Sequence, residues 1–425
     1  MKEVKVGIIG WGTVGNGVVK LITEKKEEIE RKSGVRIILK KVCDIDLERE
    51  RDVKLPPPLL TTDAQEVIND PEIDVVVELI GGIHPAREYI LKALEKKKKV
   101  VTANKALLAE EGKEIFEKAR ETGKGIYFEA SVMAGVPILK SLKEGLVAND
   151  IDEILGIING TTNYILSSME KGKTYTEALK EAQKKGFAES DPTLDVEGWD
   201  SAHKLCILTY LSFGVWPPLG KLLVEGITGI TPLDLEYAKQ LGYSIKLLAV
   251  GKKEKGNLQL RVSPTLIPLT HPLASVRDEY NALFVKGDAV GGVTFQGKGA
   301  GSLPTASGVL SDIIDTVKNA QPWLPEEKQI PILNPDDMVL SYYLRFTVVD
   351  KPGVLSSIAG ILGKRRISIE SVVQKGRRVK GTVPVIMMTH EAREGDVREA
   401  LKEIDSLPVV KKKTLLIRVE KYTNL

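Results

Sequence analysis

Acidic side chains and one lysine gather in a short segment of the chain, between residues 186 and 211. Within it, Asp200 and Lys204 are four residues apart, so on a helix they share one face and lie one turn from each other. An exposed ion pair of this kind contributes only about 0.3–0.5 kcal/mol. This pair, however, directly precedes the apolar run that begins at Leu205. Ionised groups at the edge of a core need partners or a chemical task, so the segment is a candidate for acid–base chemistry.

The composition is that of a globular protein with several domains. The 425 residues are 42% hydrophobic and 28% charged, and such a chain is too long for a single core. A net charge of +3 gives no reason to expect a nucleic-acid partner. Apolar runs fall short of the ~20 residues that span a membrane, and Cys43 and Cys206 do not suggest a disulfide framework. We therefore expect a cytoplasmic protein with no membrane partner.

The N-terminal segment has the pattern of a dinucleotide-binding turn. A short apolar run at 4–9 predicts a buried parallel strand, and a helix-like stretch follows at 16–30. Between them stands GWGTVG, whose glycines permit a tight turn while the helix N-terminus offers its N–H groups to a pyrophosphate. The predicted cofactor-binding residues of this turn are Gly10, Gly12, Thr13, Val14 and Gly15.

The second predicted strand, at 36–43, bears on the choice of nucleotide. It ends in Asp44, and a carboxylate at this position suits the ribose diol of NAD. Several cations stand close enough in the sequence to hold the 2′-phosphate of NADP instead: Lys40, Lys41, Arg49 and Arg51. The sequence therefore leaves NAD and NADP open.

Strands and helices alternate as far as residue 129 and predict a Rossmann-type, doubly wound parallel sheet of the α/β class. Ligands of such sheets gather beyond the carboxyl ends of the strands. Thr102, Lys105 and Glu129 come at those ends, as does the pair 81–82 of glycines. A cation is unfavourable at a helix N-terminus, so Lys105 is a second candidate functional lysine, expected with Thr102 beside the cofactor.

Beyond these alternating elements the pattern changes. Helices are expected at 162–171 and 176–185, and strands at 151–159, 244–251, 257–267, 281–287 and 291–297. Antiparallel pairing of these strands would explain the pattern and predicts an α+β domain. A second glycine-rich loop at 297–301 precedes a helix at 304–318, which by its length could return to the nucleotide domain. The predicted parts are a nucleotide-binding Rossmann domain (1–136), a catalytic, substrate-binding and dimerisation domain (137–318), a proline-rich linker (319–338) and a C-terminal βαββαβ domain (339–425).

Together these motifs resemble the homoserine dehydrogenases that carry a C-terminal ACT regulatory domain. The matching segments are GWGTVG at 10–15, ANK at 103–105, EASVMAGVP at 129–137, NGTTNYIL at 159–166, AESDPTLDVEGWDSAHK at 188–204, GKGAG at 297–301 and DKPGVLSSIAGIL at 350–362. The resemblance implies reversible, NAD- or NADP-linked reduction of L-aspartate 4-semialdehyde to L-homoserine in threonine and methionine biosynthesis. It also implies a homodimer or homotetramer, because ACT domains commonly pair by their sheets.

The resemblance assigns roles in the reaction to individual residues. Lys204 resembles the proton donor to the aldehyde oxygen, and Lys105 resembles a second active-site lysine close to substrate and nicotinamide. Glu189 and Asp200 look like substrate ligands for the amino group, with Asp195 nearby. The residue types suit this chemistry, because hydride transfer to a carbonyl leaves an alkoxide that a proton-donating lysine stabilises.

The resemblance also implies binding sites outside the reacting groups. Gly186 and Gly301 match further cofactor-contacting positions. A monovalent-cation site, usually for Na⁺, is implied for the carboxylate of one residue and the backbone carbonyls of three others: Glu129, Val132, Ala134 and Val136. The C-terminal domain is expected to bind an amino-acid effector such as threonine, although the arginines at 365–366 differ from the amide or small polar residues common at that edge.

Two alternative functions can be compared with this one, and the sequence argues against both. A non-catalytic sensor of amino acids and nucleotides could use the same folds, but it would not need the two lysines. An aldehyde dehydrogenase acting through a cysteine thioester would need an exposed thiolate, which neither Cys43 nor Cys206 is placed to supply. A chain truncated near Pro335 is expected to remain active and to lose inhibition by an amino acid.

Overall fold

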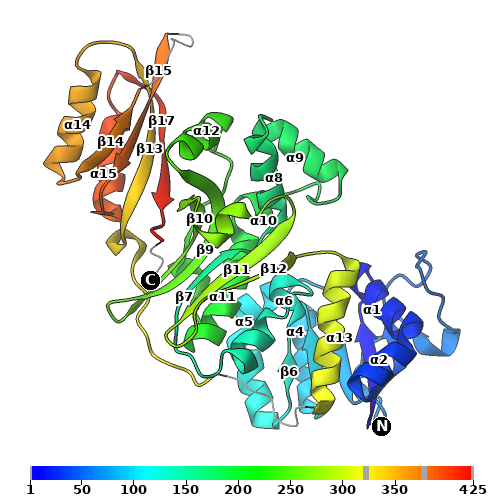
Figure 1. Cartoon of the computed structure of the whole chain (residues 1–425). Coiled ribbons are helices and arrows are strands. Elements are labelled where there is room, and N and C mark those ends of the chain that lie inside the picture. Colours follow the sequence, from blue (N-terminus) through cyan, green and yellow to red (C-terminus); the bar gives the residue numbers. More distant parts are fainter. Residues whose placement is uncertain (1, 319–324, 375–380, 423–425) are drawn as a thin grey trace. The chain divides into compact units, whose positions relative to one another are not determined.

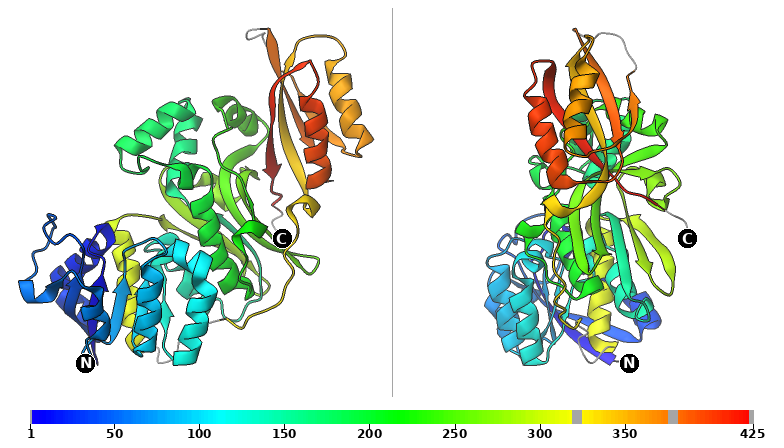
Figure 2. Two further views of the ribbon diagram at one scale, coloured as in Figure 1. Left: turned by 180° about the vertical axis from the view of Figure 1, so that it is seen from behind. Right: turned by 90° about the vertical axis from the view of Figure 1, so that its left-hand side faces the viewer.

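The computed structural model describes residues 2–318, 325–374 and 381–422, drawn in Figure 1 and Figure 2. The chain divides into two compact units. Unit 1 comprises Met1–Ile151, His203–Leu219 and Lys286–Gln329, and unit 2 comprises Asp152–Ala202, Gly220–Val285 and Ile330–Leu425. The four-part division expected from the sequence is finer and stays a prediction, and 319–324 of the expected linker lie outside the described residues. Within the described ranges, no helix has the length and apolar character that crossing a membrane requires.

Unit 1 is built around a six-stranded sheet with the order β3-β2-β1-β4-β5-β6, and all its strands run parallel. The strands are β1 (Lys2–Ile9), β2 (Val35–Cys43), β3 (Leu60–Thr61), β4 (Val75–Glu78), β5 (Lys99–Thr102) and β6 (Ile126–Tyr127). The strand order reverses between β1 and β4, which is the switch point of the Rossmann fold. The predicted doubly wound parallel sheet is confirmed.

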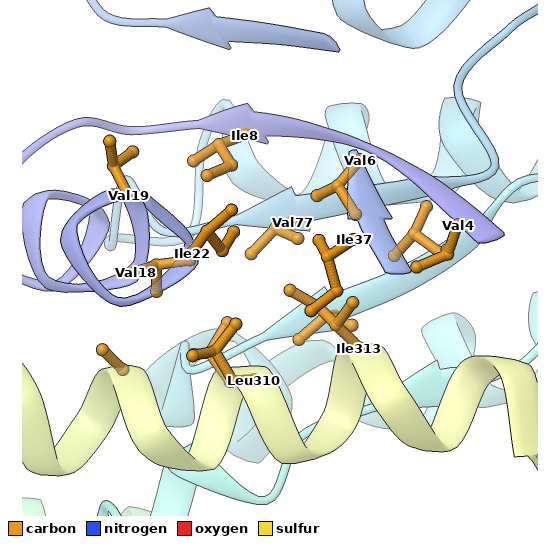
Figure 3. Packing of buried hydrophobic residues seen from close by; sticks show 14 of the residues in the cluster. Val4, Val6, Ile8, Val18, Val19, Ile22, Ile37, Val77, Leu310 and Ile313 are labelled. Atoms are coloured by element: carbon orange, nitrogen blue, oxygen red, sulfur yellow. The ribbon is translucent and has the colours of Figure 1, made fainter. Parts of the chain in front are cut away.

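The helices of unit 1 connect these strands, and one of them comes from far along the chain. They are α1 (Thr13–Glu24), α2 (Lys26–Ser33), α3 (Ala64–Asn69), α4 (Ala86–Glu95), α5 (Lys105–Thr122), α6 (Ala130–Met133), α7 (Ile138–Lys140) and α13 (Ser302–Lys318). The helix expected at 16–30 is interrupted at Lys25, so α1 and α2 are separate. Leu310 and Ile313 point from α13 toward Ile37 and Val77 of the sheet (Figure 3). The apolar stripe at one face of α13 thereby closes the core of unit 1.

Unit 2 contains long antiparallel strands. Their order is β11-β7-β9-β10-β17-β13-β15-β14. The first four are β7 (Ile151–Ile157), β9 (Tyr243–Glu254), β10 (Asn257–Pro268) and β11 (Tyr280–Gly287). Lys255 and Gly256, both with positive φ, form the tight turn of the β9–β10 hairpin. The α-helices here are α8 (Gly160–Glu170), α9 (Tyr175–Lys184), α10 (Thr193–Val196) and α12 (Pro232–Gln240). Helix α11 (Trp199–Phe213) has residues in both units, β8 (Leu223–Val224) belongs to unit 2, and β12 (Gly291–Lys298) belongs to unit 1.

The C-terminal part shows the predicted βαββαβ order. It runs β13 (Val339–Val349), α14 (Val354–Lys364), β14 (Ile369–Val373), β15 (Thr382–Thr389), the short β16 (Ala392–Arg393), α15 (Glu394–Asp405) and β17 (Val410–Val419). Both helices cover one face of its sheet, in Figure 1 and in the turned views of Figure 2. Its own core includes Phe346, Ile358 and Leu401.

The C-terminal domain is also joined to the neighbouring sheet, which its sequence did not indicate. Strand β17 pairs in parallel with β10 through Thr265 with Arg418 and Leu266 with Val419. On its other side β17 pairs antiparallel with β13. The self-contained pattern predicted from the sequence is therefore part of a larger continuous sheet within unit 2.

Candidate active site

The glycine turn of unit 1 leaves the start of α1 open to a phosphate. Gly10 has a φ of +105°, and a Cβ atom at Gly15 would lie 2.1 Å from the Gly10 carbonyl oxygen. Both positions therefore require glycine. Gly12 is the N-cap of α1, and no described side chain caps this helix or places a carboxylate in its first turn. Its N–H groups and its dipole can receive a pyrophosphate.

The second glycine loop lies against this turn. Gly301 has a φ of +118°, and Ser302 Oγ donates a hydrogen bond to the Thr13 carbonyl oxygen at 2.7 Å. A Cβ atom at Gly17 would lie 2.6 Å from Ser302 Oγ, so that glycine permits the close approach of α1 and α13. The structure thus brings Gly301 beside Thr13. The other glycine that the resemblance singled out, Gly186, follows α9 in unit 2 with a φ of +75°.

Asp44 is fixed at the end of β2. Its carboxylate accepts hydrogen bonds from the Trp11 N–H at 2.5 Å and from the Asp46 N–H at 2.9 Å. The guanidinium of Arg51 lies 4.2 Å from the centre of the Trp11 ring. The lysines that could have served a 2′-phosphate have carboxylate partners elsewhere: Lys40 pairs with Glu72 and Lys41 with Glu66, both at 2.7 Å.

A buried carboxyl group at the end of β4 organises the neighbouring strand ends, and sequence reasoning missed it. Glu78 accepts a hydrogen bond from Thr102 Oγ1 at 2.6 Å and from the Ile80 N–H at 2.9 Å. Burial raises the pKa of Glu78 even though these hydrogen bonds lower it. Thr102 Oγ1 in turn accepts from the Asn104 N–H at 3.0 Å, and Asn104 Nδ2 donates to the Gly82 carbonyl at 2.6 Å.

This network fixes the start of α5, where Lys105 stands. Asn104 is the N-cap of the helix, and its Oδ1 accepts from the Leu107 N–H at 3.2 Å. Lys105, the first residue of α5, is half-buried. The signal in the sequence is the lone carboxylate of Glu78 at the end of an apolar strand, three residues before a pair of glycines. A charge inside such a run needs partners.

Helix α5 packs against the part of α11 that belongs to unit 1. His203 Nε2 lies 3.8 Å from Glu110 Oε1 near the start of both helices. Arg120 Nη2 donates to the hydroxyl of Tyr210 at 2.8 Å near their far ends. One contact joins residues near the N-terminal ends of the two helices, and the other joins residues near their C-terminal ends. The two helices therefore run in the same direction. His203 contributes to this packing.

The same packing places both candidate lysines at one end of the helix pair. Lys204 directly follows His203, and it is 7% exposed. Lys105 precedes Glu110 by five residues, which is about 7.5 Å along the helix axis. Asp200 stands one turn before Lys204 on α11 and is also buried. Lys105 and Lys204 therefore stand at the same end of this helix pair within unit 1.

Two of the candidate carboxylates in unit 2 share one amide group. Asn159 Nδ2 donates to Asp195 Oδ1 at 2.6 Å and to Asp200 Oδ2 at 2.8 Å. Asn159 also caps α8, because its Oδ1 accepts from the Thr162 N–H at 2.8 Å. The third candidate, Glu189, is exposed, and in the described part of the chain no hydrogen bond joins it to either aspartate. The carboxylates of Asp195 and Asp200 therefore lie close together at Asn159.

The carboxyl group expected at a cation site is buried in unit 1. Glu129 accepts hydrogen bonds from the N–H groups of Leu139 at 2.8 Å and Lys140 at 2.7 Å. Burial raises the pKa of Glu129 to about 7, against the lowering effect of these bonds. The ammonium of Lys140 is bound to Asp315 at 2.7 Å. A further positive charge beside Glu129 is therefore favourable.

The backbone around this carboxyl group suits a monovalent cation. Ala134 has a φ of +53°, and the Val136 carbonyl accepts from the Ile138 N–H at 2.7 Å, which leaves one lone pair for another partner. Among the residues described, no group of three or more His, Cys, Asp or Glu could hold a metal ion. Oxygen donors are those that hard cations prefer. Glu129 and the carbonyls of Val132, Ala134 and Val136 would hold the ion.

Both cysteines are buried and protonated. Burial raises the pKa of Cys43 to about 11 and that of Cys206 to about 12. Cys206 Sγ also contacts the Pro217 carbonyl oxygen at 3.7 Å. Neither supplies the thiolate that a thioester mechanism requires. What remains is a parallel nucleotide sheet with a glycine turn, a second glycine loop and a lysine at a strand end, which is the arrangement of nicotinamide-dependent oxidoreductases.

Comparison with known proteins agrees with this class and narrows it. Residues 10–129 match the family model for the NAD-binding domain of homoserine dehydrogenase, residues 137–314 the model for homoserine dehydrogenase itself, and residues 342–409 the ACT domain. The homoserine dehydrogenase of Pseudomonas aeruginosa is 45% identical over 433 residues, which cover 99% of both chains.

Solved structures give the same result. The crystal structure of a homoserine dehydrogenase from Thiobacillus denitrificans is 42% identical, with a TM-score of 0.92 over 99% of both chains. A hyperthermophilic archaeal homoserine dehydrogenase mutant, in complex with NADPH, is 29% identical, with a TM-score of 0.63 over 74% of this chain and 98% of its own. The chain belongs to the homoserine dehydrogenase family. It is an NAD(P)-dependent oxidoreductase with a C-terminal ACT domain.

Proposed function

We propose that this enzyme reduces L-aspartate 4-semialdehyde to L-homoserine reversibly, with Lys204 as the proton donor. The observation that carries the proposal is the clamp of Asp195 and Asp200 on Asn159, since it lies one helical turn from Lys204 along α11. Both ends of the reaction contain an ammonium group, which such a clamp binds. The bound nicotinamide supplies or accepts the hydride.

The two lysines act on the oxygen where negative charge develops. Lys204 gives its proton to the alkoxide oxygen, and in the reverse direction it takes the proton of the homoserine hydroxyl. Lys105 stands at the end of β5 and stabilises the same oxygen as a second cation close to the nicotinamide. The Glu78 network holds Lys105 at the first position of α5.

The outer groups of the substrate and cofactor have their own sites. Glu189 is a third ligand for the amino group, although it is exposed in this structure. Thr102, Gly186 and Gly301 contact the cofactor together with the 10–15 turn. The cation at Glu129 is sodium. The ACT domain binds an amino acid such as threonine as a feedback effector, and the protein works as a homodimer or homotetramer in threonine and methionine biosynthesis.

A substitution of the proposed proton donor tests this function. Lys204→Ala should lower kcat for homoserine oxidation by about 10²–10⁴-fold, the usual loss of a general acid, with the KM for the nicotinamide cofactor unchanged. The rates are followed by the absorbance of the reduced nicotinamide with NAD and with NADP. Near-wild-type turnover by the variant would remove Lys204 from its role. A wild-type protein that binds homoserine without oxidising it would favour the non-catalytic sensor.

A second variant addresses the choice of cofactor. Asp44→Asn removes the negative charge at the end of β2 and leaves a side chain of the same size. Because the carboxylate repels a 2′-phosphate, we expect kcat/KM with NADP to rise relative to that with NAD by about tenfold, as for one charge contact at short range. An unchanged ratio would place the nucleotide ribose away from Asp44.

A further inference from the structure

Glu225, which directly follows β8, is bound by two arginines of the C-terminal domain. Arg418 of β17 donates to both of its carboxylate oxygens, at 2.7 and 3.2 Å. Arg398 of α15 donates to Glu225 Oε1 at 2.5 Å. Burial by itself raises the pKa of Glu225, but the two arginines bring it down to about 2. Glu225 is therefore a carboxylate held by charge from another part of the chain.

The two arginines are themselves fixed within the C-terminal domain. Glu394, fully buried at the start of α15, accepts from Arg418 Nε at 3.1 Å and from Arg398 Nε at 2.8 Å. The hydroxyl of Tyr342, on β13, donates to the same carboxylate at 3.0 Å. The cations that hold Glu225 thus move with α15, β13 and β17. These are three of the elements that make up the ACT domain.

The backbone beside Glu225 is bound to the segment that carries the substrate acids. The Ile227 N–H donates to the Val196 carbonyl oxygen at 2.8 Å. A Cβ atom at Gly226 would lie 2.1 Å from that same oxygen and 2.5 Å from Glu197 Cα. The loop 225–227 therefore lies in direct contact with residues 196–198. Neither segment can move toward the other without a clash.

Residues 196–198 lie between Asp195 and Asp200, the two carboxylates that Asn159 holds. A shift of the loop 225–227 consequently changes the spacing of these acids. The contact is short and made by backbone, so little of the displacement can be absorbed by side-chain rotation. One path from α15 and β17 to the acid clamp runs through the side chain of Glu225.

We propose that Glu225 is a positioning residue for the substrate acids, through which the state of the ACT domain sets the affinity for the amino-acid substrate. The proposal rests on the proposed role of Asp195 and Asp200 as ligands of the substrate ammonium. It makes a specific statement about regulation: the ACT domain acts on the KM for homoserine or aspartate semialdehyde. It leaves the glycine turn at 10–15 and Gly301 unchanged, because both belong to unit 1.

The test compares two arginine-to-glutamine variants of the C-terminal domain. Arg398→Gln removes one of the two cations at Glu225, and the Arg398 side chain is 40% exposed, so the variant should fold. Arg365→Gln is the matched control, because Arg365 is 31% exposed and pairs with Glu399 and Glu403 of the same helix α15. Both changes remove one positive charge, and only the first reaches Glu225.

We expect Arg398→Gln to raise the KM for homoserine by about fivefold or more, the lower end of coupling between linked sites. Its kcat and its KM for the cofactor should stay within about twofold of wild type, and Arg365→Gln should match wild type in all three. Glu225→Gln should raise the KM for homoserine further. An unchanged KM for homoserine in folded Arg398→Gln and Glu225→Gln would overturn the proposal. So would an equal rise for homoserine and cofactor, or an equal rise in the control.

A third variant separates this proposal from the function on which it rests. Asp195→Asn weakens the acid clamp directly and should raise the KM for homoserine on its own. If it does so while Arg398→Gln and Glu225→Gln do not, the clamp binds substrate but Glu225 does not position it. If Asp195→Asn leaves the KM unchanged while the Glu225 variants raise it, the role of the acids is wrong and the path through 196–198 fails with it.

Discussion

Glu78 in unit 1 is fully buried and the Glu225 side chain in unit 2 is 33% exposed, and the partners of their carboxyl groups differ in kind. Glu78 meets a hydroxyl and backbone N–H groups, and burial raises its pKa. Glu225 meets two guanidinium groups, which lower its pKa to about 2 against the effect of burial. The same contrast extends across the units. Glu129 and Asp312 of unit 1 also have raised pKa values through burial, while Asp234 of unit 2 is bound by Arg345 at 2.6 Å.

This difference in partners corresponds to a difference in the structural role of the carboxyl groups in the two units. In unit 1, Glu78 and Glu129 fix backbone beyond the carboxyl ends of β4 and β6, and they do so by accepting hydrogen bonds from neutral N–H and O–H groups. In unit 2 the groups join segments that are distant in sequence. Those ion pairs are stable only while both partners are present.

The largest effect should come from removing residues 339–425. Truncation leaves Asp234 and Arg261, both fully buried, without their partners Arg345 and Glu420. It also removes β17 from the edge of β10, and an uncovered sheet edge with exposed apolar side chains favours association with other chains. We therefore expect aggregation or loss of unit 2, contrary to the separable domain expected from the sequence. A truncated chain that elutes as a folded species with wild-type Tm would contradict this.

A single substitution should have the next largest effect. Arg418→Gln removes one of the cations that bind the buried carboxylate of Glu394. It also removes the two hydrogen bonds that Arg418 donates to Glu225. We expect a loss of about 3–5 kcal/mol in the free energy of unfolding, measured by urea titration. Replacing both members of the fully buried pair, Arg418→Met with Glu394→Met, should recover part of this loss, because no uncompensated charge is then left. A double variant less stable than the single one would contradict the ionic explanation.

Features that depend on neighbouring residues could be predicted from the sequence, but contacts between residues far apart in the chain could not. The 10–15 turn and the βαββαβ order could be predicted because glycine spacing and apolar periodicity are local signals. The clamp on Asn159 joins residues 36 and 41 positions away, and no pattern in the chain specifies that distance. The pairing of β10 with β17 could not be predicted either, because it joins strands that are distant in the sequence and pairs only Thr265 with Arg418 and Leu266 with Val419. The role of Glu78 could have been predicted, because a charged residue at the end of an apolar run indicates a buried carboxyl group that needs partners.

The smallest effect, and the sharpest test of the contrast, lies in the pH dependence of stability. A carboxylate with a lowered pKa stabilises the fold above its ordinary pKa, and it loses that contribution as the pH falls. For Glu225 the window lies between 4.5 and about 2. A carboxyl group with a raised pKa contributes fully below its ordinary value of 4.5, as for Glu78, and loses this contribution as the pH rises.

Glutamine variants of the two residues should therefore respond to pH in opposite ways. The Tm advantage of wild type over Glu225→Gln should shrink as the pH falls from 4.5 toward 2, because wild type then protonates and the variant cannot. The Tm advantage of wild type over Glu78→Gln should shrink as the pH rises above 4.5, because the wild-type carboxyl must then ionise where only dipoles surround it. Parallel pH profiles for the two pairs of proteins would show that the arginines and the backbone N–H groups stabilise charge equally well.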